Sequence, residues 1–366
     1  MIVRRREFLL GGAALSAGAM LPQAVSAKPA AAFTPRPGTW RRFDIVTRLE
    51  IAKPKGVTQA WVPLPSIQEL DWTRPMGNLW RANTDAVFEH RESAAGLSMV
   101  HAAWPASETK PYLEVRSRIA VRDRAVDLAK RGAIDLPRQQ RASYTAPTKL
   151  KPLEGIVKTT ADKITAGAVS ELDKARRIYD WIVENTARNP KTRGCGLGDI
   201  ASMLHMGDLT GKCADLNALY VGLARAVGLP ARDLYGVRIA PSRFGYKSLG
   251  ANSQTITSAQ HCRAEVFVTG IGWIPVDPAD VRKVMLEEPP GNRALDDNAV
   301  KNAHKALFGS WETNWLAYND ANDVPLPGSQ NREVGFLMYP QAETADGLID
   351  HLDPKNFKYT ITTTEI

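Results

Sequence analysis

Cys213 is the residue whose type and position best fit covalent chemistry. It stands in GKCADLNALY, between a glycine turn and a run with helical apolar spacing. A helix that begins near Gly211 would put Cys213 in its first turn, where unpaired N–H groups and the helix dipole favour a thiolate. Because the thiolate is the nucleophilic form of cysteine, the pattern predicts a nucleophile. The alternative is a small buried residue, which is the common role of a lone free cysteine.

A nucleophilic cysteine needs a base, and His261 has the best setting among the six histidines. It opens HCRAEVFV, an alternating strand, and GWIPVDP follows across a short turn. If the turn is centred on Gly270, Arg263 lies opposite Asp277, which becomes a same-face neighbour of His261. A turn with an even number of residues would move Asp277 to the other face. The hairpin therefore predicts an imidazole–carboxylate pair, and a simple Asp-Pro turn is the alternative role of Asp277.

Two further cysteines, Cys195 and Cys262, bring the total to three. In an oxidising compartment an odd count leaves at least one thiol unpaired within the chain. Strand alternation puts Cys262 on an apolar face, whereas Cys195 lies in the glycine loop RGCGLGD. A Cys195–Cys262 disulfide is one hypothesis, and a Cys195–Cys213 disulfide, which would inactivate the nucleophile, is another.

Taken together, these motifs resemble the transglutaminase-like superfamily of cysteine acyl transferases. The family pattern is Gly-x-Cys at a helix start, Gly-(Ile/Leu)-Pro-Ala-Arg, a His-x-x-x-Glu strand and a Gly-Trp-x-x-x-Asp-Pro partner, and all four occur here in order over about 175–285. The resemblance implies Cys213 as nucleophile, His261 as base and Asp277 as the residue that orients the base. It also implies a papain/transglutaminase-like core, with N-terminal helices packed on an antiparallel β-sheet.

The resemblance also suggests residues that support the site. CADLN is similar to the Cys-x-x-x-Asn of related amidase-type members, so Asn217 is expected to support the triad. Arg263 stands where the family commonly has an aromatic residue and favours an anionic substrate, and Trp273 of the Gly-Trp motif is a candidate neighbour of the substrate. No Gln or Trp precedes the nucleophile to complete an oxyanion hole, so we expect the Cys213 N–H to be one donor. His205 is a candidate second donor, or else a surface histidine.

The expected fold class is α+β. Alternation in WRRFDIVTRLEI and YLEVRSRIAVRD predicts a β-sandwich-like domain, and helical spacing begins near Ile156. The expected segments are a signal peptide (1–27), a linker (28–37), an N-terminal antiparallel β domain (38–135), the transglutaminase-like core (150–290) and a C-terminal extension packing on the core (291–366).

The first residues have the pattern of an export signal. A basic start precedes a Gly/Ala-rich apolar stretch and the small-residue sequence Val25-Ser26-Ala27. Arg5-Arg6-Glu7-Phe8-Leu9 fits the twin-arginine pattern, and an ordinary export signal with incidental arginines is the alternative. Since no second apolar run is long enough to cross a bilayer, we expect a soluble periplasmic protein without stable membrane insertion.

The composition and the residue spacing argue against some classes of partner and cofactor. The chain is 44% hydrophobic and 23% charged, and its net charge of +8 includes no long basic block, so we expect no nucleic-acid partner. No residues have metal-ligand spacing, so neither a metal nor a cofactor is expected. The expected function is cysteine-dependent acyl transfer or amide hydrolysis, through a thioester, on a peptide, protein or other amide. A catalytically inactive periplasmic binding or assembly protein is the alternative, and the substrate, the acyl acceptor and the oligomeric state stay open.

Overall fold

The computed structural model describes residues 32–83, 86–92, 96–330 and 333–366. The signal peptide expected over 1–27 lies outside these residues, as does the start of the expected linker. Residues 32–40 form no helix or strand, but Phe33 is buried, with its ring 5.2 Å from that of Phe244 and 5.0 Å from that of Tyr246. The end of the linker is therefore anchored on the core. No helix in the described ranges combines the length and apolarity needed to span a membrane.

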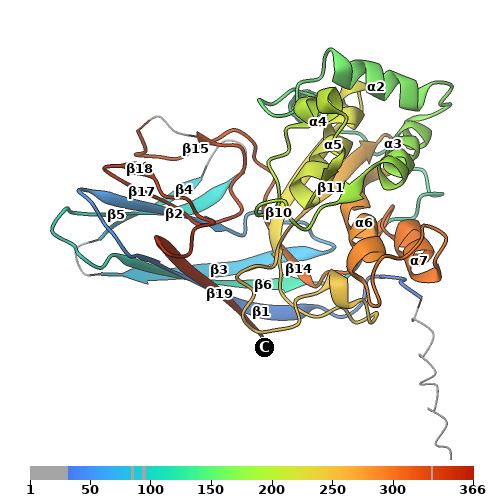
Figure 1. Ribbon diagram of the computed structural model, residues 1–366. Coiled ribbons are helices and arrows are strands. Elements are labelled where there is room, and N and C mark those ends of the chain that lie inside the picture. The colour runs from blue at the N-terminus through green and yellow to red at the C-terminus, as the bar shows by residue number, and fades with distance from the viewer. Residues whose placement is uncertain (1–31, 84–85, 93–95, 331–332) are drawn as a thin grey trace, which may run out of the picture. The chain divides into compact units, whose positions relative to one another are not determined.

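Two antiparallel sheets form a β-sandwich, as the sequence predicted (Figure 1). The first contains β1 (Arg41–Ile51), β3 (Thr73–Ala82), β6 (Tyr112–Val121) and β19 (Phe357–Glu365), in the order β19-β1-β6-β3. The second contains β2 (Thr58–Leu64), β4 (Val87–Glu92), β5 (Ser98–Trp104), β17 (Gln341–Thr344) and β18 (Gly347–Leu348), in the order β18-β17-β2-β5-β4. Alternate residues of the strands point inward, so Leu49, Val62 and Val115 share one apolar cluster between the sheets.

The C-terminal segment completes both sheets of the sandwich. In the first sheet β19 pairs with β1, with Ile361 opposite Thr47, and in the second β17 pairs with β2, with Ala342 opposite Ala60. The sequence predicted that 291–366 packs on the core, but its strands also form part of the N-terminal β region. These partners come from opposite ends of the chain, so no local pattern marks the pairing.

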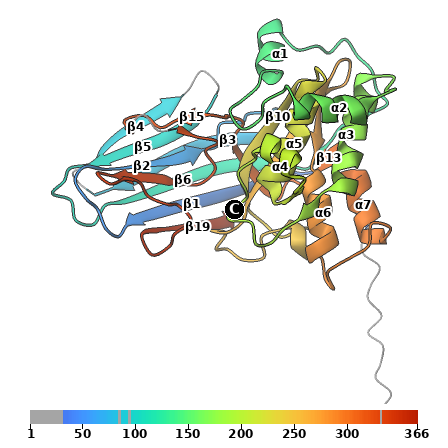
Figure 2. The ribbon, with the colours of Figure 1, turned by 45° about the horizontal axis from the view of Figure 1, so that its top comes forward.

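A second four-stranded antiparallel sheet carries the helices. Its strands are β10 (Ala231–Arg238), β11 (Gln260–Val268), β12 (Gly272–Val276) and β14 (Trp315–Asn319), in the order β12-β11-β10-β14. The helices are α1 (Arg138–Tyr144), α2 (Ile156–Thr165), α3 (Glu171–Asn185), α4 (Ile200–Met206), α5 (Cys213–Ala226), α6 (Pro278–Glu287) and α7 (Asn298–Ala306). Helix α5 packs on β10 and β11, and α2, α3 and α4 lie beside it (Figures 1 and 2). Every residue of α5 is buried, which makes it the central helix of this region.

Short strands connect the larger elements. They are β7 (Arg124–Ala125), which pairs with β13 (Ser310–Trp311), β15 (Val324–Pro325), which pairs with β16 (Glu333–Val334), and β8 (Ala187–Arg188), which runs parallel to β9 (Thr210–Gly211). A single 3₁₀ turn, η1 (Lys247–Leu249), interrupts the loop before β11. The β8–β9 pair holds the residues just before α5 and so fixes where that helix begins.

Candidate active site

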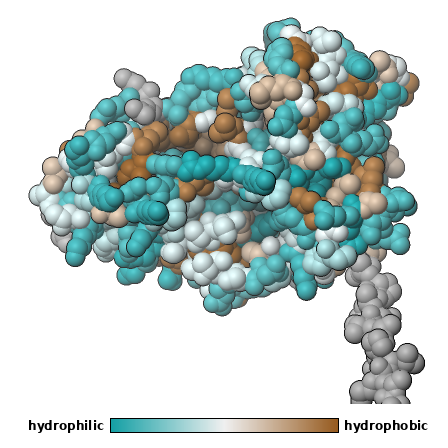
Figure 3. Space-filling view, viewed as in Figure 1, coloured by the Kyte–Doolittle hydropathy of each residue, from teal (hydrophilic) through white to brown (hydrophobic). Residues whose placement is uncertain are grey.

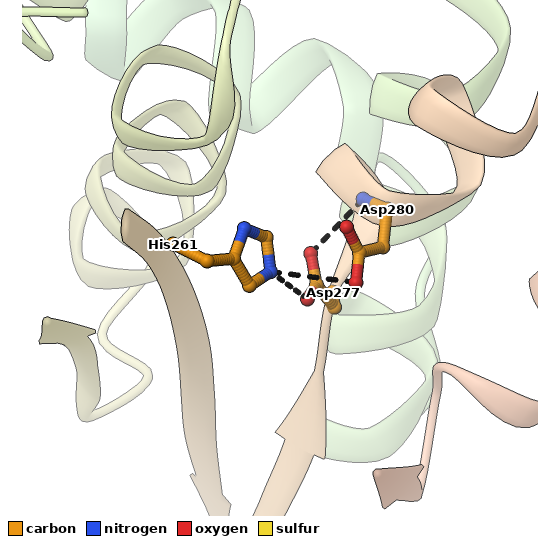
Figure 4. Close-up of side chains that lie close together, drawn as sticks. All are labelled: His261, Asp277 and Asp280. Carbon is orange, nitrogen blue, oxygen red and sulfur yellow. Dashed lines mark hydrogen bonds and ion pairs between the residues drawn. The ribbon is translucent and has the colours of Figure 1, made fainter. Parts of the chain in front are cut away.

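The hairpin of β11 and β12 places His261 beside Asp277. The register pairs Val268 with Gly272, so the turn is centred on Gly270, which confirms the register predicted from the sequence. Gly270 has a φ of +83°, in the left-handed region that favours glycine. Across this hairpin His261 Nε2 donates to Asp277 Oδ2 at 2.7 Å, and both side chains are buried. The second ring nitrogen points away from the carboxylates (Figure 4).

Both carboxylate oxygens of Asp277 have partners. Oδ2 accepts from His261 and lies 3.5 Å from Arg263 Nε. Oδ1 accepts from Asn217 Nδ2 at 3.2 Å and from the backbone N–H of Asp280 at 3.0 Å, the latter because Asp277 is the N-cap of α6. These bonds fix the carboxylate and hence the orientation of the imidazole.

Asp280 is a second carboxylate beside the imidazole, and the sequence analysis missed it. Its Oδ2 lies 3.4 Å from His261 Nε2 and has no hydrogen-bond partner, while its Oδ1 accepts from Arg238 Nη2 at 2.5 Å. The signal for it was the spacing DPAD, since the third residue of a helix turns back toward the N-cap. Arg238 has no such local signal, because it comes from β10.

The start of α5 is shaped by Asp215. Its carboxylate accepts from the backbone N–H groups of Leu197 at 2.9 Å, Gly198 at 3.0 Å and Lys212 at 3.0 Å. The carboxylate lies so close to Gly211 that a Cβ there would stand 2.5 Å from one of its oxygens. The Gly-x-Cys spacing is therefore needed for this packing, which leaves Cys213 as the first residue of α5.

Asn217, one turn after the nucleophile, ties α5 to the hairpin. It is fully buried, and its Nδ2 donates to the Cys262 carbonyl at 2.8 Å as well as to Asp277. Its Oδ1 accepts from the Ala279 N–H at 3.4 Å. One side chain thus connects α5, which carries Cys213, with β11, which carries His261, and with the start of α6, which carries Asp277.

The charges around His261 favour the imidazolium. Burial and the nearby Arg238 cation lower the pKa of His261, but Asp280 and Asp277 outweigh them and raise that pKa to about 9. Burial and the charge of Asp280 raise the pKa of Asp277. For Asp280, Arg238 and His261 overcome burial and hold the pKa well below its ordinary value. At neutral pH His261 is therefore protonated between two acidic groups.

Cys195 and Cys262 lie near Cys213, and all three are free, buried thiols. The neighbouring thiols of Cys195 and Cys262, and then His261, hold the pKa of Cys213 well below its ordinary value despite burial. Conversely, these interactions and burial raise the pKa of Cys195 and of Cys262. Cys213 is thus the thiol of the three that ionises, as a thiolate beside an imidazolium.

The predicted Cys195–Cys262 disulfide is not formed in this structure, and neither is a Cys195–Cys213 disulfide. Cys195 Sγ instead donates to the Gln260 carbonyl at 3.4 Å, and Cys262 Sγ lies 3.8 Å from Met338 Sδ. The second hypothesis for Cys262, a small buried strand residue, agrees with its complete burial.

Arg263 does not contact a substrate site, contrary to the expectation from the sequence. Its side chain is only 2% exposed. Its Nη1 donates to the Glu312 carbonyl at 3.0 Å, and its guanidinium lies over the rings of Trp311 and Trp315, at 5.3 and 4.9 Å. Arg263 therefore supports Asp277 from behind, on the side away from the cavity described below.

Trp273 and His205 also lie outside the site. The Trp273 ring packs edge-on against Tyr144 at 5.0 Å and Phe267 at 5.6 Å, with the Arg232 guanidinium 4.5 Å above it. It lines neither cavity of the site. His205 is exposed in the last turn of α4 and lines neither cavity, so the surface role is the correct one and it is not an oxyanion donor.

Two of the sequence motifs meet in a structural ion pair rather than at the nucleophile. Arg232 of the Gly-Leu-Pro-Ala-Arg motif donates to Glu265 of the His-x-x-x-Glu strand at 2.6 Å. Glu265 is fully buried and also contacts Arg124 of β7, which links the hairpin to the end of the N-terminal β region. Because a buried carboxylate without partners is costly, these arginines explain why both motifs are needed to support the hairpin.

Cys213 and His261 open into a cavity of about 860 Å³. A second cavity, of about 750 Å³, adjoins it across Cys195 and three residues of the C-terminal segment, Tyr339, His351 and Leu352, which line both. Sequence analysis did not anticipate this contribution. Hydrophobic surface on the face seen in Figure 3 is divided into separate patches with hydrophilic surface between them.

The donor atoms of His261, Asp277 and Asp280 lie within 4.8 Å of one another, which is close enough to hold a metal ion. However, the Arg238 and Arg263 cations already face the two carboxylates, and the protonated imidazole adds a third positive charge. A divalent cation would have to displace these charges in a fully buried site. We therefore interpret the cluster as an orienting network for His261.

Comparisons with known proteins identify the family and the fold. The family model of the Transglutaminase-like superfamily matches residues 158–278, the range that holds Cys213, His261 and Asp277. A protein of Haemophilus influenzae, itself uncharacterised, is 34% identical over 337 residues, covering 87% of this chain and 89% of its own length.

Two solved structures extend the comparison. A candidate cysteine protease of Cytophaga hutchinsonii has 14% identity and a TM-score of 0.51, over 90% of this chain and 99% of that one. The periplasmic domain of TgpA from Pseudomonas aeruginosa is less similar, with 16% identity and a TM-score of 0.37, over 68% of this chain and 72% of that domain. The first of these likenesses extends the shared fold beyond the family match, to the sandwich strands and the C-terminal segment.

Proposed function

The chain belongs to the transglutaminase-like superfamily, and from that premise we propose that it is a cysteine-dependent acyl transferase or amide hydrolase. It uses a Cys213–His261–Asp277 triad and a thioester intermediate. The observation that carries the proposal is the buried His261–Asp277 hydrogen bond of 2.7 Å, made through Nε2, while His261 itself lines the cavity that Cys213 also lines. This bond leaves the other ring nitrogen free for the sulfur.

The first step is attack of the Cys213 thiolate on the carbonyl carbon of an amide. The C–S bond forms as the carbonyl π bond breaks, and negative charge collects on the oxygen. The backbone N–H of Cys213 makes no hydrogen bond among the described residues, because it is the first residue of α5. It is therefore available to donate to this oxyanion.

His261 carries the proton in both halves of the reaction. As the C–N bond breaks, the imidazolium protonates the leaving amine and becomes neutral, which leaves a thioester on Cys213. Water or a second amine then gives a proton to His261 while it attacks the thioester, which releases the thiolate. Asp277 holds the ring in the correct orientation and stabilises its positive charge in each step.

We also propose that the protein acts after export to the periplasm. The support for this is the sequence of residues 1–27, with the Arg5-Arg6 pair before an apolar stretch and a small-residue cleavage pattern. Free cysteines in an oxidising compartment are open to oxidation; Cys262 is fully buried and lines neither cavity, whereas Cys195 and Cys213 line the cavity of the site.

The proposal is tested by the reactivity of Cys213 toward iodoacetamide as a function of pH, with the modified peptide identified by mass spectrometry. We expect fast modification well below the ordinary cysteine pKa of about 8.5, and a rate at pH 6 about 100-fold lower in His261→Ala. Transfer of an acetyl group from p-nitrophenyl acetate to the Cys213 sulfur then tests the thioester step, and addition of a primary amine separates transfer from hydrolysis.

His304→Ala is the matched control. His304 Nε2 lies 2.8 Å from Asp180 Oδ1, so it is a second His–Asp pair, but it lines neither cavity. Its removal should leave the profile of Cys213 unchanged. An ordinary thiol profile in the wild type, unaltered in His261→Ala, would instead identify an inactive binding or assembly protein.

A further inference from the structure

Besides the His261 imidazolium, the cavity of Cys213 and His261 is lined by five lysine and arginine side chains and, among the described residues, by no carboxylate. The five come from separate elements of the fold: Arg188 of β8, Lys212 at the N-cap of α5, Arg238 of β10, Lys283 of α6 and Lys358 of β19. Convergence of one charge sign from five elements makes a local positive potential over the recess, where water screens it less than at an open surface, except at Lys358, which is itself exposed.

Three of these five cations have carboxylate partners that do not themselves line the cavity. Arg238 pairs with Asp280, and Glu287 lies beside both Arg188 and Lys283, at 3.5 Å from the lysine Nζ. By contrast, neither Lys212 nor Lys358 has an ion-pair partner among the described residues. Neither lysine is therefore neutralised by a close ion pair, although Glu50, which is itself paired with Arg48, stands opposite Lys358 in the register of β1 and β19.

The adjoining cavity shows that this bias is not a general property of the surface. It is lined by four aspartates, Asp199, Asp208, Asp215 and Asp350, and by a single arginine, Arg193. The excess of cations is thus confined to the side of the site that holds the nucleophile and the base.

An unsatisfied donor points in the same direction. Gln260, next to His261, lines the catalytic cavity; among the described residues its buried Nε2 makes no well-formed hydrogen bond, although its side chain interacts with the Tyr359 hydroxyl. A buried N–H group without an acceptor is unfavourable, so an oxygen of a bound ligand would complete it. The loop before β11 adds further polar groups to the same wall, among them Asn252, Thr255 and Ser258.

We infer that the substrate of the proposed reaction is an acidic peptide, whose carboxylate lies close to the scissile amide and is bound by Lys212 and Lys358. Lys212 directly precedes the nucleophile, so a carboxylate paired with it lies near the carbonyl under attack. The anion preference that the sequence suggested for Arg263 is thus assigned to two other residues. The inference rests on the proposed function, because the cavity binds a substrate only if Cys213 is its nucleophile.

Two reagents of similar size, one charged and one neutral, test it at the same sulfur. Iodoacetate is anionic and iodoacetamide is neutral, and both alkylate a thiolate with loss of iodide. The ratio of their rates at Cys213 is normalised to the ratio for the same cysteine in denatured protein. We expect the normalised ratio to fall about threefold in Lys212→Gln and about twofold in Lys358→Gln, with smaller effects at high salt.

Lys305→Gln is the matched control, since Lys305 is exposed on α7 and lines neither cavity. It removes the same charge and should leave the ratio unchanged. The His261 imidazolium also attracts iodoacetate, but it is present in every variant, so it cancels in the comparison. Equal ratios in wild type, Lys212→Gln and Lys358→Gln would overturn the inference.

A second readout uses peptides as competitors. Acetyl-Ala-Glu-Ala-amide should protect Cys213 from iodoacetamide at concentrations at least about fivefold lower than acetyl-Ala-Gln-Ala-amide, since the two differ by one charge. Protection that is equal for both peptides would contradict the inference. Failure of the proposed function has a different signature, because both reagents would then react slowly and with an ordinary thiol pH profile.

Discussion

The hairpin of β11 and β12 and the C-terminal segment from Glu333 to Glu365 both line the cavity of Cys213, but they are held there differently. In the hairpin, a three-residue turn and an antiparallel register bring His261 to Asp277. In the C-terminal segment, Tyr339 and Lys358 reach the cavity only because β17 and β19 pair with strands of the N-terminal sandwich.

The groups proposed to react are therefore held by local contacts in the hairpin and α5, whereas the walls of the cavity are held by strand pairing between distant parts of the chain. The proton-carrying groups are buried and hydrogen-bonded within a short stretch of sequence, so they form wherever the hairpin and α5 form. The walls of the cavity depend on the folding of the two ends of the chain together. A change in the sandwich should therefore alter stability and binding, whereas a change in the hairpin should alter the pKa and reactivity of the triad in an intact fold.

Among changes in the C-terminal segment, Phe357→Ala should have the largest effect, which is a loss of stability. Phe357 begins β19, is 1% exposed and belongs to the apolar cluster between the two sheets. Loss of its ring leaves a cavity that should lower the free energy of unfolding by about 3–5 kcal/mol. Denaturant unfolding followed by circular dichroism measures this loss.

Phe357→Leu, which keeps most of the apolar volume, should recover more than half of the stability. Since Phe357 also lines the cavity of Cys213, a second variant of β19 is needed: the folded fraction of Ile361→Ala, which removes a buried side chain that lines neither cavity, should keep the low-pH reactivity of Cys213 toward iodoacetamide. If that reactivity disappears from protein that is still folded, the sandwich and the triad are coupled and the separation drawn above is wrong.

The geometry of the hairpin could be predicted because it depends on residues that are close together in the sequence. Alternation in HCRAEVFV and the glycine at 270 fixed which residues face each other, and the Gly-x-Cys spacing fixed the start of α5. The same parity correctly put Arg263 on the face of His261. It could not show that Trp311 and Trp315 cover Arg263, because these come from a distant segment.

Other parts of the site depended on long-range packing. Asp280 could have been found from its helix-capping spacing, but its pairing with Arg238 requires β10 to lie beside α6. The clustering of Cys195 with Cys213 depends on the loop before α4, whose Cys195 carbonyl accepts from the Ala214 N–H at 2.9 Å. Nor does any short pattern reveal that β19 closes the first sheet, since strand pairing between chain ends has no sequence periodicity of its own.

Within the hairpin, Asp280→Asn should give a smaller effect, confined to protonation. The variant leaves the Arg238 cation without its carboxylate, so the pKa of His261 should fall from about 9 toward its ordinary value. The imidazolium is the proton donor and exists only below this pKa, so the alkaline limit of the acylation reaction should move to lower pH. NMR titration of isotope-labelled histidine measures the shift, with His261→Gln for assignment.

Two further variants separate the effect of charge on the pKa of His261 from the effect of the orientation of its ring. Arg238→Gln combined with Asp280→Asn removes both charges and should return the pKa of His261 part of the way. Asp277→Asn also lowers the pKa but in addition frees the ring, so it should reduce the reactivity of Cys213 at pH 6 more than Asp280→Asn does, by about tenfold or more. Equal effects of the two single variants would mean that orientation by Asp277 contributes little.

Tyr339→Phe should give the smallest effect, at the point where the two regions meet. Tyr339 is 5% exposed, lines both cavities and interacts through its hydroxyl with the Cys195 thiol. Its hydroxyl thus contacts a neighbour of the nucleophile rather than the reacting carbonyl, and one neutral hydrogen bond contributes about 1 kcal/mol. We expect acetylation of Cys213 by p-nitrophenyl acetate to slow by no more than about fivefold, which is that energy expressed as a rate.

A loss of about 100-fold in the acetylation rate would instead be the size expected for removal of an oxyanion donor. That outcome would mean that the C-terminal segment supplies a catalytic group. The reacting groups would then not all be held by the hairpin and α5.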